Sequence, residues 1–452
     1  MELLKLVINS TNNLLWGKNI LVVMLIGTAI YISFKTRFMQ IRLFKEILGT
    51  LFTDSNNKNG ASSLEAFYLG TACRVGAGNI AGVIAAISVG GPGALFWMWI
   101  VAILGASTSF IESTLAVLYR DKDENGNYRG GTPWIIKKKI KKRWIGLVYS
   151  IASVVCYMGV IQVTSNAVVE STSGAYGINK YILSLGMAII VGLTIFGKSK
   201  KDRIISALNK IVPLMAFLYL AVVLFVILTN INSIPSMLKN IMYQAFGGEQ
   251  LFGGAMGAVI MQGVRRGLFS NEAGSGNSNY AAALVDIDEP AKQGMVQALG
   301  VFVDTILICS ATAFIVLLAD KNITDGLSGM VLFQESLRSH IGWIGIPFTV
   351  LILFFFSYST ILGVTVYGKN ALLFIGEQNY LNKIYQILVI LMVYIGGIQQ
   401  NYFVWSLADF GLGIMTVINI IVIFPYIGVG VEELKKYETK LQKNQEQKER
   451  VC

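Results

Sequence analysis

Two glycine-rich stretches decide the fold of this chain: residues 74–79 read RVGAGN, and residues 267–277 read GLFSNEAGSGN. Each stretch ends in Gly-x-Gly-Asn, and each lies inside a long apolar run. A helix in lipid must satisfy its own backbone hydrogen bonds, so clustered glycines in the middle of such a run need a specific reason. Matched interruptions in two halves of a chain are typical of transporters whose binding site lies between broken helices.

Unwinding a helix at such a cluster frees carbonyl groups to coordinate a cation and amide groups to hold a carboxylate. For either cluster alone, a small-residue packing face between helices is the better interpretation. Two matched clusters with polar neighbours favour a binding site. The clusters lie five predicted spans apart, a spacing that reverses their orientation in the membrane, as an inverted repeat requires.

The composition indicates a polytopic membrane protein. The 452 residues are 54% hydrophobic and only 14% charged, and the mean hydropathy is +0.60. Soluble domains carry roughly 25% charged residues. The net charge of +11 does not indicate a nucleic-acid partner, because the lysines and arginines fall in loops between apolar runs.

A spanning helix needs about 20 apolar residues, and by this measure we predict eleven spans. Their predicted starts lie near Gly17, Leu69, Ala94, Trp144, Ile182, Ile211, Gly253, Met295, Trp343, Ile384 and Tyr402. With the N-terminus outside, 28 of the 37 lysines and arginines fall in inside segments and six in outside segments. This asymmetry predicts a cytoplasmic C-terminus.

These spans predict one transmembrane domain over residues 1–430, followed by a charged cytoplasmic tail over 431–452 that forms a solvated helix. Within the domain we expect an extra helix at 17–34, a first repeat at 69–229 and a second repeat at 253–430. Residues 42–52 (RLFKEILGTLF) are amphipathic, which suits a helix lying along the cytoplasmic membrane surface.

Charged residues inside the predicted spans form a second signal, since each costs roughly 2.5–3.5 kcal/mol at mid-helix. They are Arg74, Glu112, Arg265, Arg266, Glu272 and Asp304. Their charges sum to zero, which indicates pairing within the bundle. Arg265 and Arg266 are candidates for a gate or for a counter-charge to Glu272; static structural pairing is the alternative. Asp409 is expected to face water.

The ninth predicted span contains Ser359 and Thr360, whose hydroxyl oxygens suit Na⁺; hydrogen bonding back to the preceding turn is the alternative. The cysteines show no disulfide or metal spacing. The only histidine, His340, falls in a predicted loop. No reactive dyad is visible, so we do not expect an enzyme.

Several strings resemble the alanine or glycine:cation symporter family, the sodium:alanine symporter type. They are residues 70–72, 90–99 with Glu112, 266–274 and 303–305, and the resemblance runs from about residue 15 to 430. It implies an all-α fold like that of the leucine transporter, with five plus five inverted repeats and one extra N-terminal helix.

The resemblance also implies site residues. The implied substrate site contains Val75, Gly76, Gly78, Asn79, Gln162, Phe269, Gly274, Thr360 and Val364. The implied Na⁺ site contains the carbonyls of Ala72 and Val75 with the hydroxyls of Ser359 and Thr360. Arg74 and Val364 depart from the usual family pattern; a valine in place of a tryptophan would enlarge the pocket, and the strings around Arg74 and Glu112 resemble a glutamine-associated branch.

We therefore expect sodium-coupled symport of a small neutral amino acid (alanine, glycine or glutamine) by alternating access, in the plasma membrane. The alternatives are proton coupling and, with less support, an ion channel. The expected partners are the amino acid, Na⁺ as coupling ion and membrane lipid, with no nucleic acid; the sequence indicates no oligomeric state.

Overall fold

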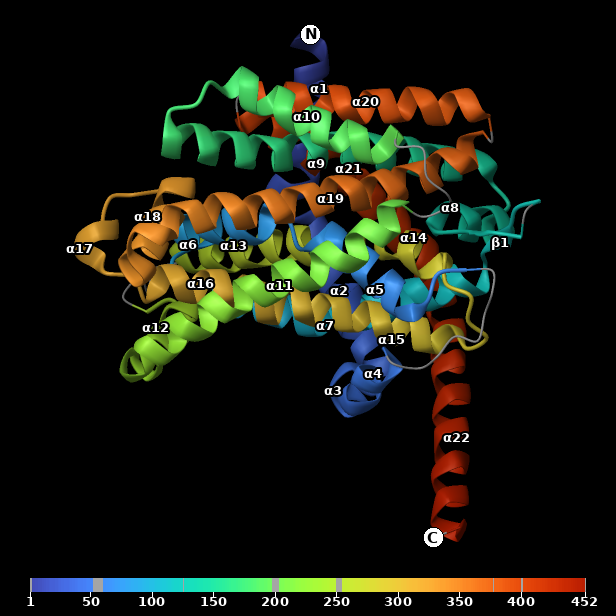
Figure 1. The fold of residues 1–452 in the computed structure, drawn as a ribbon. Coiled ribbons are helices and arrows are strands. Elements are labelled where there is room, and N and C mark those ends of the chain that lie inside the picture. Colours follow the sequence, from blue (N-terminus) through green and yellow to red (C-terminus); the bar gives the residue numbers. More distant parts are fainter. Residues whose placement is uncertain are drawn as a thin grey trace.

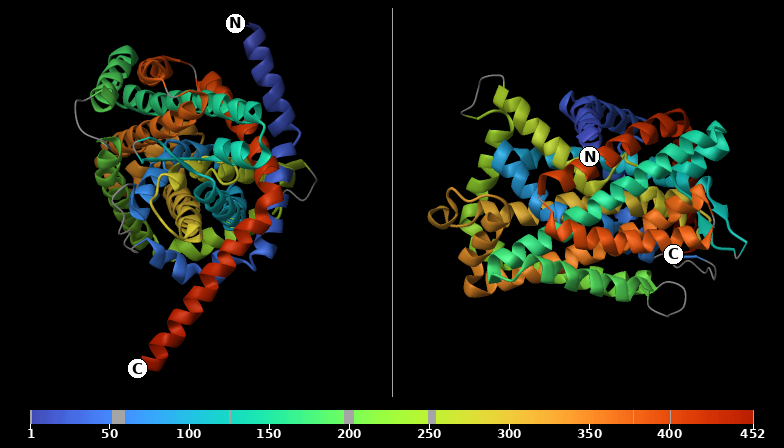
Figure 2. Two further views of the ribbon diagram at one scale, coloured as in Figure 1. Left: turned by 90° about the vertical axis from the view of Figure 1, so that its right-hand side faces the viewer. Right: turned by 90° about the horizontal axis from the view of Figure 1, so that it is seen from above.

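The computed structural model describes residues 2–51, 60–124, 126–196, 203–248, 254–376, 378–399 and 401–451. The described chain is a bundle of helices with one short hairpin, formed by β1 (Asp121–Lys122) and β2 (Tyr128–Arg129). Long helices run side by side through the bundle (Figure 1), and the two termini project from it on opposite sides in the left view of Figure 2.

The helices fall into three groups along the chain. The N-terminal group is α1 (Glu2–Asn12), η1 (Asn13–Gly17), α2 (Ile20–Lys35), α3 (Met39–Arg42) and α4 (Phe44–Thr50). The next group is α5 (Ser63–Arg74), η2 (Gly78–Gly82), α6 (Val83–Gly90), α7 (Ala94–Leu118), α8 (Thr132–Ile135), η3 (Ile136–Ile140), α9 (Arg143–Tyr176), α10 (Lys180–Phe196), α11 (Arg203–Thr229), η4 (Ile231–Ser233) and α12 (Ile234–Ala245). The last group is α13 (Gly254–Asn271), α14 (Ser278–Ala283), α15 (Pro290–Val301), η5 (Phe302–Cys309), α16 (Ser310–Leu317), α17 (Lys321–Thr324), α18 (Gly329–Ile341), η6 (Gly342–Ile344), α19 (Gly345–Ile375), α20 (Asn379–Ile398), α21 (Asn401–Ile423), η7 (Phe424–Tyr426) and α22 (Ile427–Val451).

Within the described ranges, seven helices are long and apolar enough to cross a membrane, and two bent pairs raise the number to nine. The pairs bend by 42° between α1–η1 and α2 and by 53° between α5 and η2–α6. Helix α10 is apolar but has only 17 residues. The count of eleven spans therefore stays a prediction, and one of its starts, Gly253, lies outside the described residues.

The outer helices present bare apolar side chains. Phe217 on α11 is 70% exposed, Leu193 on α10 is 67% exposed and Ile387 on α20 is 58% exposed. Apolar surface on this scale is unfavourable in water and suits contact with lipid chains. The chain is accordingly a multi-pass membrane protein.

Both predicted breaks are confirmed as interruptions of helices. Helix α5 begins with a capping box formed by Ser62 and Glu65 and ends at Arg74, where Val75 leaves helical geometry with a ψ of 89°. At the second break Glu272, Gly274 and Gly276 have φ values of 58°, 86° and 81°. An α-helix cannot pass through residues in the left-handed region, which glycine tolerates best.

Close helix contacts rest on single glycines where α9 crosses α21. A Cβ atom on Gly159 of α9 would lie 2.4 Å from the Ala408 amide nitrogen. Conversely, a Cβ atom on Gly411 of α21 would lie 2.5 Å from the Cys156 amide nitrogen. Small residues let helix backbones approach in a membrane, where van der Waals packing contributes much of the association energy.

The C-terminal helix α22 leaves the bundle (Figure 1), as the predicted solvated tail helix does. Glu438 on this helix accepts a hydrogen bond from Arg42 at 2.5 Å, and Lys440 pairs with Glu289.

The predicted amphipathic segment 42–52 is helical as α4 over most of its length, although Phe52 lies outside the described residues. The predicted loop at His340 is wrong: this residue lies in α18, with Nε2 2.9 Å from the Ile315 carbonyl oxygen.

We predict that Gly159→Ala lowers the thermal stability of the detergent-solubilised protein, because the added methyl meets backbone that cannot move without separating α9 from α21. Overpacking of this kind costs roughly 1–3 kcal/mol. Gly174→Ala is the control on the same helix, because nothing lies within 4 Å of its Cβ position. A thermal-shift assay should show a lower midpoint only for Gly159→Ala; equal midpoints for the two variants would contradict the packing argument.

Candidate functional site

The first break gathers oxygen atoms around Thr360 of α19. Its Oγ1 donates a hydrogen bond to the Ala72 carbonyl at 2.9 Å and lies 3.5 Å from the Val75 carbonyl oxygen. These carbonyls are free because α5 ends here and its last turn has no following amides to bind. A Cβ atom on Gly76 would lie 2.5 Å from Thr360 Oγ1, so glycine permits this approach.

The neighbouring hydroxyl of Ser359 lies differently. Its Oγ donates back to the Phe356 carbonyl at 3.0 Å and lies 3.4 Å from the sulfur of Met215. Thr360 Oγ1 also lies 2.9 Å from the same Phe356 oxygen. Of the implied Na⁺ ligands, the structure therefore brings together Ala72, Val75 and Thr360, whereas the contacts of Ser359 are those of a back-bonded helix hydroxyl.

The amides of the first break have unused capacity. The Gly76 amide donates to Oδ1 of Asn79 at 2.9 Å. In the described part of the chain, the amides of Ala77 and Gly78 have no hydrogen-bond acceptor. They lie where η2 begins, and free amides at a helix N-terminus favour a bound anion.

The amides of the second break are already occupied by Glu112 of α7. Its carboxylate accepts hydrogen bonds from the amides of Gly274 and Gly276, both at 3.2 Å, and from the hydroxyl of Ser278 at 3.0 Å. Asn419 of α21 donates to the same carboxylate at 2.7 Å. Glu112 therefore takes at the second break the place that a substrate carboxylate would need.

Asp304 of η5 links the two breaks. Its carboxylate accepts hydrogen bonds from Asn79 Nδ2 at 2.6 Å and from Ser270 Oγ at 2.7 Å. Thr305 donates to it as well, at 2.8 Å. Because Asn79 follows the first break and Ser270 precedes the second, this carboxylate holds the two interrupted helices in register.

Arg74 and Glu272 are both buried beside the breaks, and each is only partly satisfied. Nε of Arg74 donates to the Asn271 carbonyl at 3.1 Å, and Oε1 of Glu272 accepts from Asn277 at 2.9 Å. In the described ranges, Nη2 of Arg74 and Oε2 of Glu272 are buried without a hydrogen-bond partner. Burying a polar atom without a hydrogen-bond partner costs free energy, so a ligand or a water that bonds these two atoms would be stabilised here.

A small central cavity of ≈ 30 Å³ lies between the breaks. Its walls are formed by Cys73, Arg74, Gly76, Ala77, Gly78, Cys156, Val160, Val163, Thr164, Phe269, Ser270, Glu272, Asn277, Thr360 and Leu412. Since each water needs roughly 10–15 Å³ of such space, the cavity has room for about two waters and none for an amino acid. Binding of an amino acid here requires the surrounding helices to move apart.

Several predicted substrate residues lie away from this cavity. Gln162 donates to the Met158 carbonyl at 3.3 Å and lies 3.2 Å from the sulfur of Met392. Val364 is buried and its carbonyl accepts from Tyr385 at 3.2 Å. A Cβ atom on Gly274 would meet Leu25, not the cavity.

Other wall residues were not singled out from the sequence. Asn277 belongs to the second Gly-x-Gly-Asn motif and could have been chosen for that reason. Cys156, Val160, Val163 and Thr164 lie on α9, where no local pattern distinguishes them from packing residues.

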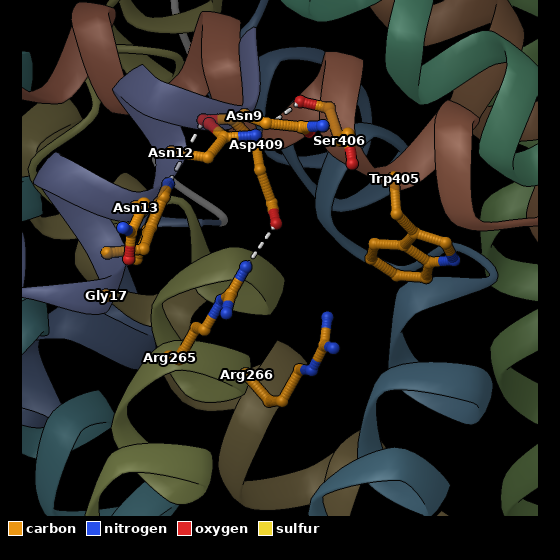
Figure 3. A pocket seen from close by; sticks show the side chains of 10 residues that line it. Asn9, Asn12, Asn13, Gly17, Arg265, Arg266, Trp405, Ser406 and Asp409 are labelled. Atoms are coloured by element: carbon orange, nitrogen blue, oxygen red, sulfur yellow. Dashed lines mark hydrogen bonds and ion pairs between the residues drawn. The ribbon is translucent and has the colours of Figure 1, made fainter. Parts of the chain in front are cut away.

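For Arg265 the structure contradicts one of the alternatives, the counter-charge to Glu272, and the expectation that Asp409 faces water is wrong. Arg265 pairs with Asp409 at 2.5 Å instead of with Glu272, and Asp409 is buried rather than facing water. Arg266 lies over the ring of Trp405, with 5.0 Å between the guanidinium carbon and the ring centroid. All four residues line an outer cavity (Figure 3), separate from the central one.

Known proteins resemble the chain over almost its whole length. The family model described as "Sodium:alanine symporter family" matches residues 1–451. The Bacillus subtilis (strain 168) protein named "Probable sodium/glutamine symporter GlnT" is 41% identical over 440 residues, covering 96% of this chain and 91% of that protein. "Amino-acid carrier protein AlsT" of the same organism is 39% identical over 432 residues, covering 95% and 91%.

Among solved structures, the manganese transporter of Eremococcus coleocola has a TM-score of 0.54 and 13% sequence identity, over 82% of this chain and 78% of that chain. At this identity the likeness concerns the fold alone, and it is the fold of a membrane transporter. The family model and the relatives confirm the resemblance seen in the sequence: this chain belongs to the sodium:alanine symporter family.

Proposed function

We propose that this protein performs sodium-coupled symport of a small neutral amino acid, and that both solutes bind at the first break. One observation carries this assignment: the Thr360 hydroxyl and the carbonyls of Ala72 and Val75 converge beside the unoccupied amides of Ala77 and Gly78. Oxygen ligands suit a hard cation and free amides at a helix start suit a carboxylate.

Coupling follows from where these groups lie. Na⁺ binding joins α5 to α19, because Ala72 and Val75 belong to one segment and Thr360 to the other. The bound cation also stabilises a carboxylate a few ångströms away, and the carboxylate stabilises the cation in turn. Each solute therefore raises the affinity for the other, as linkage between two sites requires.

The side chain of the substrate would extend toward Arg74 and Glu272. The partnerless Nη2 of Arg74 is a donor, and the partnerless Oε2 of Glu272 is an acceptor. A side-chain carboxamide presents the complementary pair, an acceptor oxygen and a donor NH₂. This match favours glutamine, in keeping with the name of the relative GlnT, whereas alanine and glycine would leave both groups without a ligand.

The finer architecture rests on the same breaks. We propose eleven spans with two inverted five-helix repeats over 69–229 and 253–430, preceded by an extra helix at 17–34. The N-terminus lies outside the cell and the tail over 431–452 lies in the cytoplasm, because most lysines and arginines then face inward. Two interrupted helices five spans apart and the fold likeness to a solved transporter support this arrangement.

Counter-flow in proteoliposomes tests the proposed function. Vesicles loaded with unlabelled glutamine, alanine or glycine should accumulate the labelled amino acid when Na⁺ is present and hardly at all when choline replaces it. A proton gradient should not substitute for Na⁺. Uptake that ignores both ion gradients, or conductance that does not saturate, would refute symport.

For the Na⁺ site, we predict that Thr360→Ala raises the Na⁺ concentration for half-maximal uptake by about tenfold, since it removes one oxygen ligand. The measurement is initial uptake against Na⁺ concentration at matched protein amounts. Thr365→Ala is the matched control: this residue lies on the same helix, is buried, and donates its hydroxyl to the Ile361 carbonyl at 2.6 Å, with no second acceptor in the part of the chain that the structure describes. If the two variants require the same Na⁺ concentration, Thr360 is not a ligand.

For selectivity, we predict that Arg74→Gln and Glu272→Gln each lower glutamine uptake relative to alanine uptake by about tenfold, because each removes half of the carboxamide pair. Competition between the two labelled amino acids in the same vesicles gives this ratio directly. A general folding defect would reduce the uptake of both amino acids equally and leave their ratio unchanged. If well-folded variants also keep the wild-type ratio, Arg74 and Glu272 do not take part in side-chain recognition.

A further inference from the structure

A second, larger cavity lies apart from the central one. Its volume is ≈ 490 Å³, and it is lined by Asn9, Asn12, Asn13, Trp16, Gly17, Arg265, Arg266, Trp405, Ser406 and Asp409. Figure 3 shows these side chains gathered around one open space, contributed by the N-terminal segment, α13 and α21. Unlike the central cavity, it has room for a whole amino acid.

The charges of this outer cavity do not balance. Arg265 is paired with Asp409 at 2.5 Å and stands 5.5 Å from the ring of Trp16. Arg266 has no hydrogen bond or ion pair with any described residue, and its Nε is buried without a partner. In Figure 3 its guanidinium stands in the open space, with Trp405 nearby. A guanidinium without an ion pair offers two parallel N–H donors, which match the two oxygens of a carboxylate.

The opposite wall offers acceptors. Asn12 donates its Nδ2 to the Ser406 carbonyl at 2.8 Å, which fixes the amide and leaves Oδ1 buried without a described partner. Asn9 and Asn13 add two further amide side chains to the same wall. Amide oxygens accept hydrogen bonds from an ammonium group and carry no charge that would repel a carboxylate.

An aromatic contact connects the wall of the outer cavity with the wall of the central one. Trp405 lines the outer cavity and Phe269 lines the central cavity, and their rings pack with centroids 4.9 Å apart. Arg266 lies against the same tryptophan ring. A solute in the outer cavity is therefore separated from the central site by this aromatic pair.

We propose that the outer cavity is a second binding site for a zwitterionic α-amino acid, with the carboxylate on Arg266 and the ammonium on the asparagines of the N-terminal segment. The identity of the ligand as an amino acid rests on the proposed function. The site itself rests on the Arg266 guanidinium, which has no hydrogen bond or ion pair with a described residue, on the facing amide oxygens and on the volume. Since no Na⁺ ligand is required there, binding at the outer site is independent of Na⁺, in contrast to the central site.

Equilibrium dialysis of the purified full-length protein with tritiated L-glutamine and L-alanine, with and without Na⁺, tests this site. The wild-type protein should bind one molecule per chain without Na⁺ and a second when Na⁺ is added. Arg266→Gln should weaken the Na⁺-independent binding by at least about tenfold, as the loss of a charge-assisted pair implies. Asn9→Trp should abolish it, because Asn9 lines the cavity from an exposed position and a larger side chain there reduces the space while Arg266 itself is unchanged.

Arg338→Gln serves as the control, because this arginine is exposed on α18 and, among the described residues, its one ion pair is with Glu335 one turn earlier. It should leave both binding events unchanged. Absence of Na⁺-independent binding in the wild-type protein would overturn the outer site. So would equal binding by the wild-type protein and by well-folded Arg266→Gln and Asn9→Trp variants.

The outcomes for the two sites are separable. If counter-flow shows no coupling to Na⁺ but Arg266-dependent binding persists, the proposed function fails and the outer site stands. If coupled counter-flow is intact while stoichiometry is one and Arg266→Gln changes nothing, the outer site fails and the proposed function stands.

Discussion

The structure depends on one constraint: a backbone amide or carbonyl inside an apolar medium must find a partner. At two places this chain gives up helical hydrogen bonds in the middle of its bundle, and at both places other groups replace them. Glu112 and Asn419 serve the second break, and Asn79 and Thr360 serve the first. The amides of Ala77 and Gly78 have no acceptor among the described residues, and a ligand that accepts hydrogen bonds from them would gain the most binding free energy.

The two breaks are thus alike in sequence but differ in what their backbone amides bind. The second break holds a carboxylate that belongs to the protein, and three residues in left-handed geometry fix its amides around Glu112. Among the described residues no such anion lies at the first break, so the amides of Ala77 and Gly78 remain available. An inverted pair of helices can in this way provide one rigid anchor and one ligand site, with Asp304 joining them.

The sequence was sufficient to find the breaks, because glycine clusters in mid-run conflict with helix formation and the conflict is local. The predicted spans also located four buried charges, Arg74, Glu112, Glu272 and Asp304, but not Asp409. The contact of Thr360 with the carbonyls of Ala72 and Val75 was implied by the family resemblance. The sequence could not assign partners: Arg265 pairs with Asp409, which lies 144 residues away, and Glu112 reaches across to amides that only the fold brings near. Gln162 and Val364 do not line the central cavity, and their contact with the substrate stays a prediction, since which face of a buried helix meets a cavity depends on packing.

The sizes of the two cavities bear on how a solute moves through the protein. The outer cavity can hold an amino acid as it stands, whereas the central one holds about two waters and must expand. Between the two cavities lie the rings of Phe269, a residue of α13, and Trp405, a residue of α21. Phe269 also packs against Gly78, with 3.4 Å to a Cβ position there. A movement of α13 away from both α21 and η2 would withdraw this ring from Trp405 and from the first break together, so that one motion would open the path and enlarge the central cavity.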